Sequence, residues 1–447
     1  MLNISQKAKN ALLAPSRYIK FKLEVYFDGE DNPPTDITHD VISFDTVEEV
    51  SPSTTLPFGG VSYNELSVVL DNMQQLYTIS NTSSVYNGKL VANKKVVLTY
   101  LVEIEDDVFE EIPGGIFYTD AWSSDNETLT ATLICYDKLA LHGSKPVSRF
   151  KIKRGISFKD AYETLFSSAG VNKTDYIIDS NLVGTLDYFW CTEDNLNKCL
   201  DSLSIYTMSN VFVDRQDRIV VKPINSKNSS TMSISDNDII YTSKSSPSYT
   251  NIYSGVNAKY NCINIQKDTL VYSVDNINVP IGETTIQNII FSSSSPILHL
   301  SSIVLKSDSD VYIKSYSYTD KTLDLVIVNN RVDSTVASIS VYGAVISQIT
   351  NTLYVDRTTG TNNVMDIEIP FVCDASYAEL YANTILDIYS RYSATITLDM
   401  RGYPPIELFD AITVNSPTSS TQGDFSVTNI CNSFLEGLSS SLTVMIF

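Results

Sequence analysis

Residues 402–412 read GYPPIELFDAI, and they stand between an amphipathic segment and the β-prone runs that close the chain. The two adjacent prolines fix their own φ angles and cannot donate to a sheet ladder, so we expect a turn, after which Ile406–Val414 resumes an extended path. Before the turn, apolar residues recur at helical spacing and predict a helix from Asp374, its N-cap, to Arg391.

Alternation of apolar and polar residues predicts strands on both sides of this turn. Ser393–Met400 precedes it, and Phe425–Ile430 follows a loop rich in Ser, Thr and Gly. The ending Leu442–Phe447 is apolar and β-prone, and it is too short to span a bilayer. We therefore expect the chain to finish as a strand inside a sheet.

The order of these elements resembles the closing barrel of phage tail hub and baseplate hub proteins. In that family a helix and a strand are followed by a Gly-x-Pro turn, a Leu-Gly-Asp-x-(Val/Ile) strand and a Gly-Gly-Leu hairpin. The family-motif residues here are Gly402, Pro404, Asp410 and Gly437. Phe409 and Glu436 stand where the family has two further glycines.

Two helices are expected in the middle of the chain. Ser157, with Asp160 three residues later, is a capping-box-like start, and Gly170 suits the left-handed position that ends a helix. A second apolar face predicts a helix from Thr192 to Tyr206.

A hairpin follows, with strands around the polar turn Asp214–Asp217. The order of helix, linker bearing Trp190, helix and hairpin resembles the small α/β domain that hub proteins place between their two barrels. Trp190 is therefore a further family-motif residue.

The first 145 residues contain several alternating segments that we interpret as strands. They resemble the first barrel of the family, in which a Gly-x-Phe-Tyr/Phe strand pairs with a strand leading to Cys/Tyr-Asp, the role taken here by Ile134–Ala140. The predicted strands are Lys20–Phe27, Leu66–Asn72, Lys95–Leu101, Ile116–Trp122 and Thr128–Cys135.

Residues 264–364 depart from the shorter hub pattern. We expect four further strands, with Ser292–Ser295 as a loop; the strands are Leu270–Val274, Val311–Tyr316, Leu323–Val328 and Ala337–Gly343. The segment is interpreted as a small β-domain inserted in the second barrel, whose opening strand near Ile252–Val256 is expected to pair with strands after Ile385. It is either a stabilising elaboration or a docking surface for a neighbouring baseplate or fibre protein.

Together these segments predict a mainly β protein with minor α content, an α+β multidomain chain, which agrees with its 447 residues and 43% hydrophobic content. Two related β-barrel domains flank a small α/β domain, and a β-domain is inserted. The predicted boundaries are 1–147 for the first barrel, 148–245 for the α/β domain, 246–263 with 365–447 for the second barrel, and 264–364 for the insertion.

The charge balance excludes one class of partner. With 52 acidic and 31 basic residues the net charge is −21, which opposes binding of nucleic acid through its phosphates. By resemblance the protein forms a ring through which DNA passes, and a negative lumen would repel the phosphate backbone. The candidate lining is the acidic stretch of Glu103, Glu105, Asp106, Asp107, Glu110 and Glu111, and the alternative is a solvated hairpin tip.

No cofactor, metal or catalytic site is predicted. The six cysteines contain no Cys-x-x-Cys pair and the three histidines lie far apart, so buried free thiols are expected and disulfides are not implied. No catalytic motif is present, and no carboxylate pair stands out. An acidic loop that includes Asp28 and Asp36 lacks the spacing of an EF-hand, which favours a water-exposed turn over a calcium site.

The resemblance implies a non-enzymatic structural tail hub. Such a protein forms a homotrimeric ring, joins the hexameric tail tube above to a spike, fibre or other baseplate protein below, and lets DNA pass. It binds no nucleic acid sequence-specifically, does not insert stably in membranes, and belongs to the virion tail tip after assembly in the host cytoplasm. The alternative is a host-recognition protein whose inserted domain binds glycan through a clustered aromatic groove. A cell-wall hydrolase is the third class.

Overall fold

The computed structural model describes residues 1–50, 56, 58–191, 193–224, 226, 232–244, 252–307, 309–357, 362–389, 396–417 and 421–445. Its α-helices are α1 (Gln6–Leu13), α2 (Lys138–Gly143), α3 (Phe158–Ser168), α4 (Leu196–Thr207) and α5 (Ala375–Tyr389). Strands dominate the rest, so the predicted mainly β class with minor α content is confirmed.

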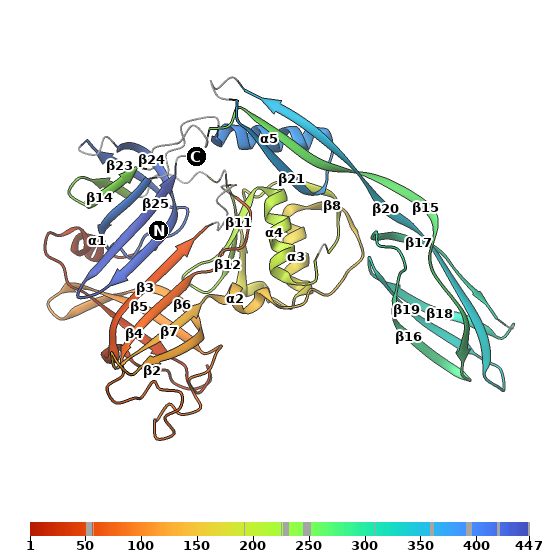
Figure 1. Ribbon diagram of the computed structural model, residues 1–447, viewed down its shortest axis with the longest axis horizontal. Helices are drawn as coiled ribbons and strands as arrows, with labels where there is room; N and C mark the ends of the chain where they lie inside the picture. The colour runs from red at the N-terminus through yellow and green to blue at the C-terminus, as the bar shows by residue number, and fades with distance from the viewer. Residues whose placement is uncertain are drawn as a thin grey trace.

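One 13-stranded sheet combines strands from both ends of the chain (Figure 1). Its order is β14-β22-β25-β24-β3-β4-β7-β6-β5-β1-β2, with β13 and β23 attached beside β24. The N-terminal strands are β1 (Ile19–Val25), β2 (Thr35–Asp36), β3 (Val41–Glu49), β4 (Glu65–Asp71), β5 (Lys95–Glu105), β6 (Val108–Asp125) and β7 (Thr130–Tyr136). The later strands are β13 (Met232–Ser235), β14 (Ile239–Lys244), β22 (Ile396–Arg401), β23 (Ala411–Ser416), β24 (Thr421–Phe434) and β25 (Leu438–Met445).

The two ends of the chain meet where β24 pairs antiparallel with β3, with Phe434 opposite Phe44. The rings of these two residues stack with centroids 5.5 Å apart, and the ring of Phe21 lies 4.7 Å from that of Phe434. Aromatic pairs at such spacings add to the apolar area that they bury. The regions that the sequence predicts as two barrels therefore share one continuous sheet and one hydrophobic core.

A middle module of helices and short strands packs beside this sheet. β8 (Lys153–Ser157) pairs with β10 (Thr185–Phe189), and a three-stranded sheet has the order β11 (Ser209–Val213), β12 (Ile219–Pro223), β9 (Tyr176–Ile178). Ser157 Oγ accepts a hydrogen bond from the backbone N–H of Asp160 at 3.1 Å, and Gly170 has φ +70°, as the sequence predicts. α4 begins after its N-cap Asn195, whereas the predicted start, Thr192, lies outside the described residues.

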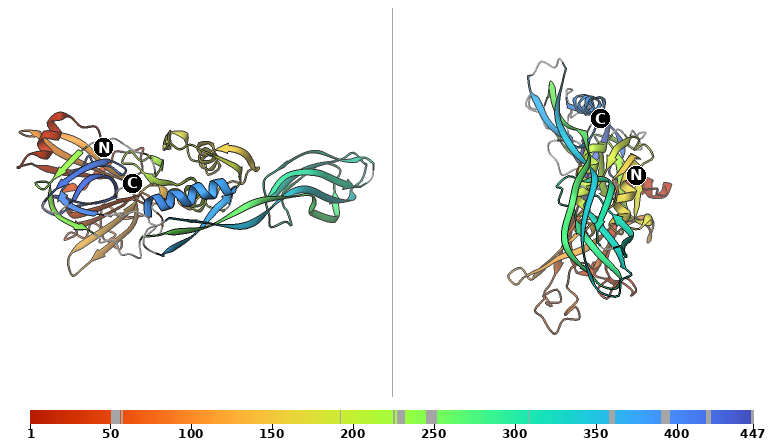
Figure 2. Two further views of the ribbon diagram at one scale, coloured as in Figure 1. Left: turned by 90° about the horizontal axis from the view of Figure 1, so that it is seen from above. Right: turned by 90° about the vertical axis from the view of Figure 1, so that its right-hand side faces the viewer.

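The insertion forms a long arm that projects from the body (Figures 1 and 2). Two long strands, β15 (Gly255–Val279) and β20 (Thr335–Asp356), run antiparallel along it, flanked by β17 (Ile297–Lys306) and β21 (Val364–Val372). Near its far end a second sheet of β16 (Gly282–Ile290), β19 (Thr322–Asn329) and β18 (Val311–Tyr318) packs on the first across a separate core. We call this two-sheet part the tip.

Two strand predictions need correction. Gly255 and Val256 pair with β20 and β21, so the expected pairing of Ile252–Val256 with strands after Ile385 is wrong; the long ribbon supplies those backbone partners instead. Ile406–Asp410 is not extended, because the chain turns at Leu408 and Phe409 and resumes a strand only at Ala411. β16, β17 and β21 were not predicted, and the Ser292–Ser295 loop was.

The C-terminal predictions otherwise hold. Asp374 Oδ1 accepts a hydrogen bond from the N–H of Tyr377 at 2.8 Å, as an N-cap does. β25 lies between β22 and β24, so the last described strand is internal to the sheet. The predicted boundaries at Arg391, Ser393 and Phe447 lie outside the described residues.

Candidate functional site

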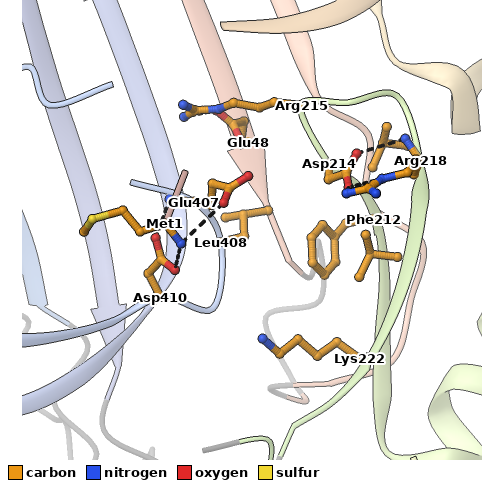
Figure 3. A pocket seen from close by; sticks show the side chains of 12 residues that line it. Met1, Glu48, Phe212, Asp214, Arg215, Arg218, Lys222, Glu407, Leu408 and Asp410 are labelled. Atoms are coloured by element: carbon orange, nitrogen blue, oxygen red, sulfur yellow. Dashed lines mark hydrogen bonds and ion pairs between the residues drawn. The ribbon is translucent and has the colours of Figure 1, made fainter. Parts of the chain in front are cut away.

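A polar junction lies where three distant parts of the chain meet (Figure 3). The turn between β11 and β12 approaches β3 from one side, and the turn that follows β22 approaches from the other. The hollow between them has a volume of about 250 Å³. It is lined by Met1, Glu48, Phe212, Val213, Asp214, Arg215, Arg218, Val220, Lys222, Glu407, Leu408 and Asp410.

Arg215 ties these three parts together from within the core. Its side chain is 2% exposed and that of Glu48 is 5% exposed. Arg215 Nε and Nη2 donate to Glu48 Oε1 at 2.9 and 2.7 Å, and Nη1 donates to the carbonyl oxygen of Pro404. Burial disfavours the guanidinium charge, but the Glu48 carboxylate outweighs it and raises the pKa of Arg215. The pair joins β3 to the turn between β11 and β12, and removing one partner would leave the other charge buried without its main partner.

Asp410, a family-motif residue, organises the opposite side of the junction. Its Oδ2 accepts a hydrogen bond from the N–H of Glu407 at 2.7 Å, which closes the turn. The α-amino group of Met1 contacts Asp410 and lies 3.3 Å from Glu407 Oε2, as the dashed lines of Figure 3 show. Burial raises the pKa of the Glu407 carboxyl.

The remaining motif residues of this turn have geometric roles. A Cβ atom on Gly402 would lie 2.4 Å from Leu438 Cγ, so only glycine allows this approach of the turn to β25. The carbonyl oxygen of Gly402 accepts from Arg17 at 2.7 Å, and that of Pro404 accepts from Arg215. Gly437 lies in the exposed turn between β24 and β25. The structure thus brings Gly402, Pro404 and Asp410 to one turn at the junction.

Trp190 lies in a different place. It is buried beneath the base of the arm, where its ring meets that of Phe371 edge-on with centroids 6.0 Å apart. Leu298 and Ile346, from β17 and β20, belong to the same small cluster. Trp190 therefore joins the middle module to the arm.

The acidic stretch forms the hairpin of β5 and β6, with Asp106 and Asp107 at its turn. Two of its carboxylates contact α1: Glu105 pairs with Lys7, and Glu110 accepts from the N–H of Ser5 at 2.8 Å. Asp107 holds a left-handed φ of +56° that suits a tight turn. The six predicted residues thus share one largely exposed hairpin, where water screens their charges.

Two residues at or near the junction were not singled out from the sequence. Arg215 stands in the predicted polar turn Asp214–Asp217, and only the inward fold of this turn reveals its role. Asp137 follows β7 and is buried, and its carboxylate accepts from the backbone N–H groups of Asn64 and Leu139 at 2.7 and 2.9 Å. The Tyr-Asp pattern of the family was the available sign for Asp137.

Most charges that line the junction lie in ion pairs. Glu48 pairs with Arg215, Asp214 with Arg218, and Glu407 and Asp410 with the α-amino group of Met1. Within the described ranges no group of three metal-ligating side chains occurs, and no helix is both long and apolar enough to cross a membrane. In the acidic loop near the start, Asp28 and Glu30 form ion pairs with Lys89 and Lys95.

The two most exposed tyrosines of β18 lie on opposite faces of that strand. Tyr312 and Tyr316 are 49% and 53% exposed. Tyr312 lies opposite Val328 and Tyr316 opposite the buried Leu325, so the two rings point to opposite faces of β18. The ring of Tyr316 stacks on that of Tyr318, with centroids 6.5 Å apart, so a pair of aromatic rings lies on the face of β18 that Tyr316 shares.

Comparison with solved structures gives the fold a precedent. A tail protein from Neisseria meningitidis MC58 matches with a TM-score of 0.54 and 8% identity over 96% of this chain and 96% of that chain. The 43 kDa tail protein of prophage MuSo2 from Shewanella oneidensis matches with a TM-score of 0.54 and 9% identity over 96% and 98%. The chain has the fold of a phage tail protein.

This likeness to tail proteins covers the arm as well as the body, because almost the whole of each chain is aligned. No protein-family model matches the sequence, and no curated protein matches it. The tail-protein fold predicted from the C-terminal, middle and N-terminal segments is therefore confirmed by structure, although the two matched chains are only 8% and 9% identical to this one.

Proposed function

We propose that the chain is a structural, non-enzymatic hub of a phage tail or a related particle, and that three copies form a ring. The observation that carries this proposal is the continuous sheet in which β24 of the C-terminal region pairs with β3 of the N-terminal region. Each copy then presents two β-rich regions at a fixed angle. Three copies present six, which suits a hexameric tail tube above and a three-fold spike or fibre below.

The division of labour within the chain follows from this arrangement. We assign the strands of the large sheet, β1–β7, β13, β14 and β22–β25, to the two ring-forming regions, β8–β12 with α3 and α4 to the middle module, and β15–β21 to the arm. The two ends of the large sheet, β2 and β14, are the strand edges that a neighbouring subunit would cover.

The acidic hairpin of β5 and β6 is assigned to the wall of the passage. The net charge of −21 and the exposure of Asp106 and Asp107 at the turn support this assignment. A wall of this sign repels phosphates, so DNA would slide past it without binding. The assembled hub would belong to the virion tail tip.

The mass of the full chain in solution tests the ring, by native mass spectrometry and by light scattering, with and without the tail tube protein of the same particle. The expected species is three copies of the 49.6 kDa chain, seen as a ring by electron microscopy. A chain that stays monomeric at every concentration, both alone and with the tube protein, would contradict the proposal.

Charge reversal tests the wall. Lysine at Asp106 and Asp107 should leave the mass of the assembly unchanged and slow DNA passage, most strongly at low salt. Lysine at Asp333 and Glu283, two exposed acids of the tip, is the matched control and should leave passage unchanged. Equal effects of the two pairs would place the hairpin away from the passage.

A further inference from the structure

Two thiols lie against each other in the middle module. Cys191 follows β10, Cys199 lies in the N-terminal part of α4, and their sulfur atoms are 3.7 Å apart. Both residues are almost fully buried, with 1% and 2% of their surface exposed. A disulfide needs an S–S distance of about 2.0 Å, so a relative shift of less than about 2 Å would bring this pair to bonding distance.

The loop between β10 and α4 holds the two sulfur atoms on one acceptor. The carbonyl oxygen of Glu193 accepts a hydrogen bond from Cys191 Sγ at 3.0 Å and from Cys199 Sγ at 3.3 Å. Glu193 itself is exposed. The pair therefore lies directly beneath a surface loop, and a local opening of this loop would expose both thiols without unfolding the domain.

The closed loop protects the pair from oxidants. The hydrogen bond with Cys199 and burial raise the pKa of the Cys191 thiol, and the charge of the nearby Arg149 guanidinium opposes this rise. The thiolate is the form that attacks a disulfide, so the closed state reacts slowly. We expect the pair to react when the loop opens, and the two sulfur atoms then lie close enough to bond with each other.

We propose that Cys191 and Cys199 are a modification site, at which an intramolecular disulfide forms by exchange with a small-molecule disulfide such as oxidised glutathione. The thiolate of one cysteine attacks the oxidant and releases one glutathione thiolate. The thiolate of the other cysteine then attacks the mixed disulfide and releases the second. The chain gives up two electrons and two protons, and the oxidant leaves as two thiols.

A bond at this place would fasten the base of the arm. Cys191 directly follows Trp190, whose ring packs on that of Phe371 in β21. Arg149 joins the carbonyl oxygen of Cys191 to the carboxylate of Asp320 in the tip. Figure 1 shows α4 in the middle module, between the large sheet and the arm. The bond would tie the segment on which the arm packs to this helix.

The timing of the reaction follows from the redox state of each compartment. The cytoplasm keeps thiols reduced, whereas disulfides persist outside the cell. We therefore expect thiols during assembly and the bond in the released particle. This timing alone rests on the function proposed above. The chemistry of the pair does not, so the two can fail separately.

The test uses the full chain, first reduced and then incubated with oxidised glutathione in a buffer in which it stays folded. Intact mass and peptide mapping without reductant identify the linkage. We expect a chain lighter by two hydrogen atoms, with Cys191 joined to Cys199, and a higher midpoint of thermal unfolding. The same treatment in concentrated urea should also link other pairs, because six cysteines allow many.

Two variants provide the matched comparison. Cys191→Ala removes one partner and should abolish both the linkage and the rise of the thermal midpoint. Cys431→Ala, in β24 of the large sheet, should keep both. Amide exchange before oxidation shows whether α4 stays folded in each variant. The linkage map of the unsubstituted chain decides the question even if the Cys191 variant fails to fold.

Several results would overturn the proposal. They are an unchanged mass of the folded chain after prolonged incubation, a linkage between other cysteines such as Cys262 and Cys373, and the same mixture of linkages in buffer and in urea. A glutathione adduct on Cys191 or Cys199 of the unsubstituted chain that never closes to a disulfide would also overturn it. Peptide mapping of particles before and after release checks the timing separately.

Discussion

Phe409 and Glu436 hold backbone conformations that suit glycine, with φ of +65° and +62°. These are the two positions at which the hub pattern has glycine and this chain does not. A left-handed conformation costs an L-residue roughly 1–2 kcal/mol. The chain therefore keeps the backbone conformation of the hub pattern at a cost in conformational free energy. Whether that cost is offset depends on the contacts of each side chain.

At Glu436 we expect no compensation, because the side chain is exposed. Glu436→Gly should stabilise the protein by about 0.5–1 kcal/mol and raise the midpoint of thermal unfolding, since glycine relieves the strain and loses part of that gain through its greater freedom in the unfolded chain. Glu436→Ala removes the same charge but keeps a Cβ atom. An equal gain in the alanine variant would show that charge, not backbone strain, is responsible.

At Phe409 the same change should have the opposite sign. The side chain is 2% exposed, its ring stacks on that of Phe212 at 5.7 Å, and the Lys222 ammonium lies 5.0 Å from the ring centroid. Removing a buried phenyl group costs about 3–5 kcal/mol, so Phe409→Gly should destabilise by about 2–4 kcal/mol even after strain is relieved. The free energy of unfolding in urea checks this, and a neutral or stabilised variant would contradict it.

Asp137 gives a pH dependence at the same scale. Burial raises the pKa of its carboxyl to about 7, although backbone N–H donors oppose this. In the unfolded chain the pKa is near 3.9, so between about pH 4 and pH 7 the folded state holds a proton that the unfolded state has lost. This contribution to stability is complete below pH 4 and is lost as the pH rises through 7.

Asp137→Asn cannot ionise and keeps an acceptor oxygen. Its free energy of unfolding, relative to the unsubstituted protein, should therefore rise between about pH 4 and pH 7, by at most about 1.4 kcal/mol per pH unit, and level off above. Urea unfolding at several pH values measures this. A difference that is constant with pH would show that Asp137 is ionised throughout.

At the scale of elements, the turn between β11 and β12 packs into the junction through the side chain of Arg215. Glu48→Gln leaves the Arg215 guanidinium buried without a countercharge and should destabilise the protein by about 3–5 kcal/mol. Asp28→Asn, which breaks the exposed pair with Lys89, is the control and should cost less than about 1 kcal/mol. Chemical denaturation of both variants tests this; equal costs would mean that Glu48 and Arg215 do not depend on each other.

Helices and strands were predictable from the sequence where one face is buried and the other is exposed to solvent. α5, α3 and β4 show this clearly, since their apolar residues recur at the period of the element. β16 and β17 were not predicted from the sequence. They are edge strands of a small sandwich, where serine, threonine and asparagine interrupt the alternation of apolar and polar residues. The buried contact of Arg215 was not predicted, because the sequence of a polar turn does not indicate that its arginine will pair with a carboxylate far away in the sequence.

At the scale of the whole molecule, an ion pair fastens the tip of the arm to the middle module. Asp320 is fully buried, and Arg149 Nη1 donates to its Oδ2 at 3.1 Å and to the carbonyl oxygen of Cys191 at 2.9 Å. Arg149 belongs to the segment before β8 and Asp320 to the tip. This contact therefore sets the direction of the arm relative to the middle module.

Arg149→Met should loosen the arm without unfolding its tip. Amide exchange should become faster near Phe150, whose carbonyl oxygen accepts from the N–H of Asp320 at 3.2 Å, while β19 keeps its protection. Lys314→Met, which breaks an exposed pair within the tip, is the control and should leave exchange near Phe150 unchanged. Loss of protection in β19 would show instead that Arg149 stabilises the tip itself.

Pairing between distant segments was the part least accessible from the sequence. Periodicity assigns a strand to a face and says nothing of which other strand lies beside it. A strand at the position of β24 was predicted and β3 was not, and nothing in either segment indicates that the two pair with each other. The expectation for Ile252–Val256 was wrong for the same reason.

The join between β3 and β24 also has a consequence for biosynthesis. Asn432 and Thr46 touch across it from positions 386 residues apart. At about 5 to 20 residues per second, a ribosome needs roughly 20 to 80 s to make the intervening chain. During that time the edge of β3 that will pair with β24 is open, and nascent chains on one polysome can associate through it. Slower initiation or a bound chaperone would protect the growing polypeptide, and yield should fall when expression is fast.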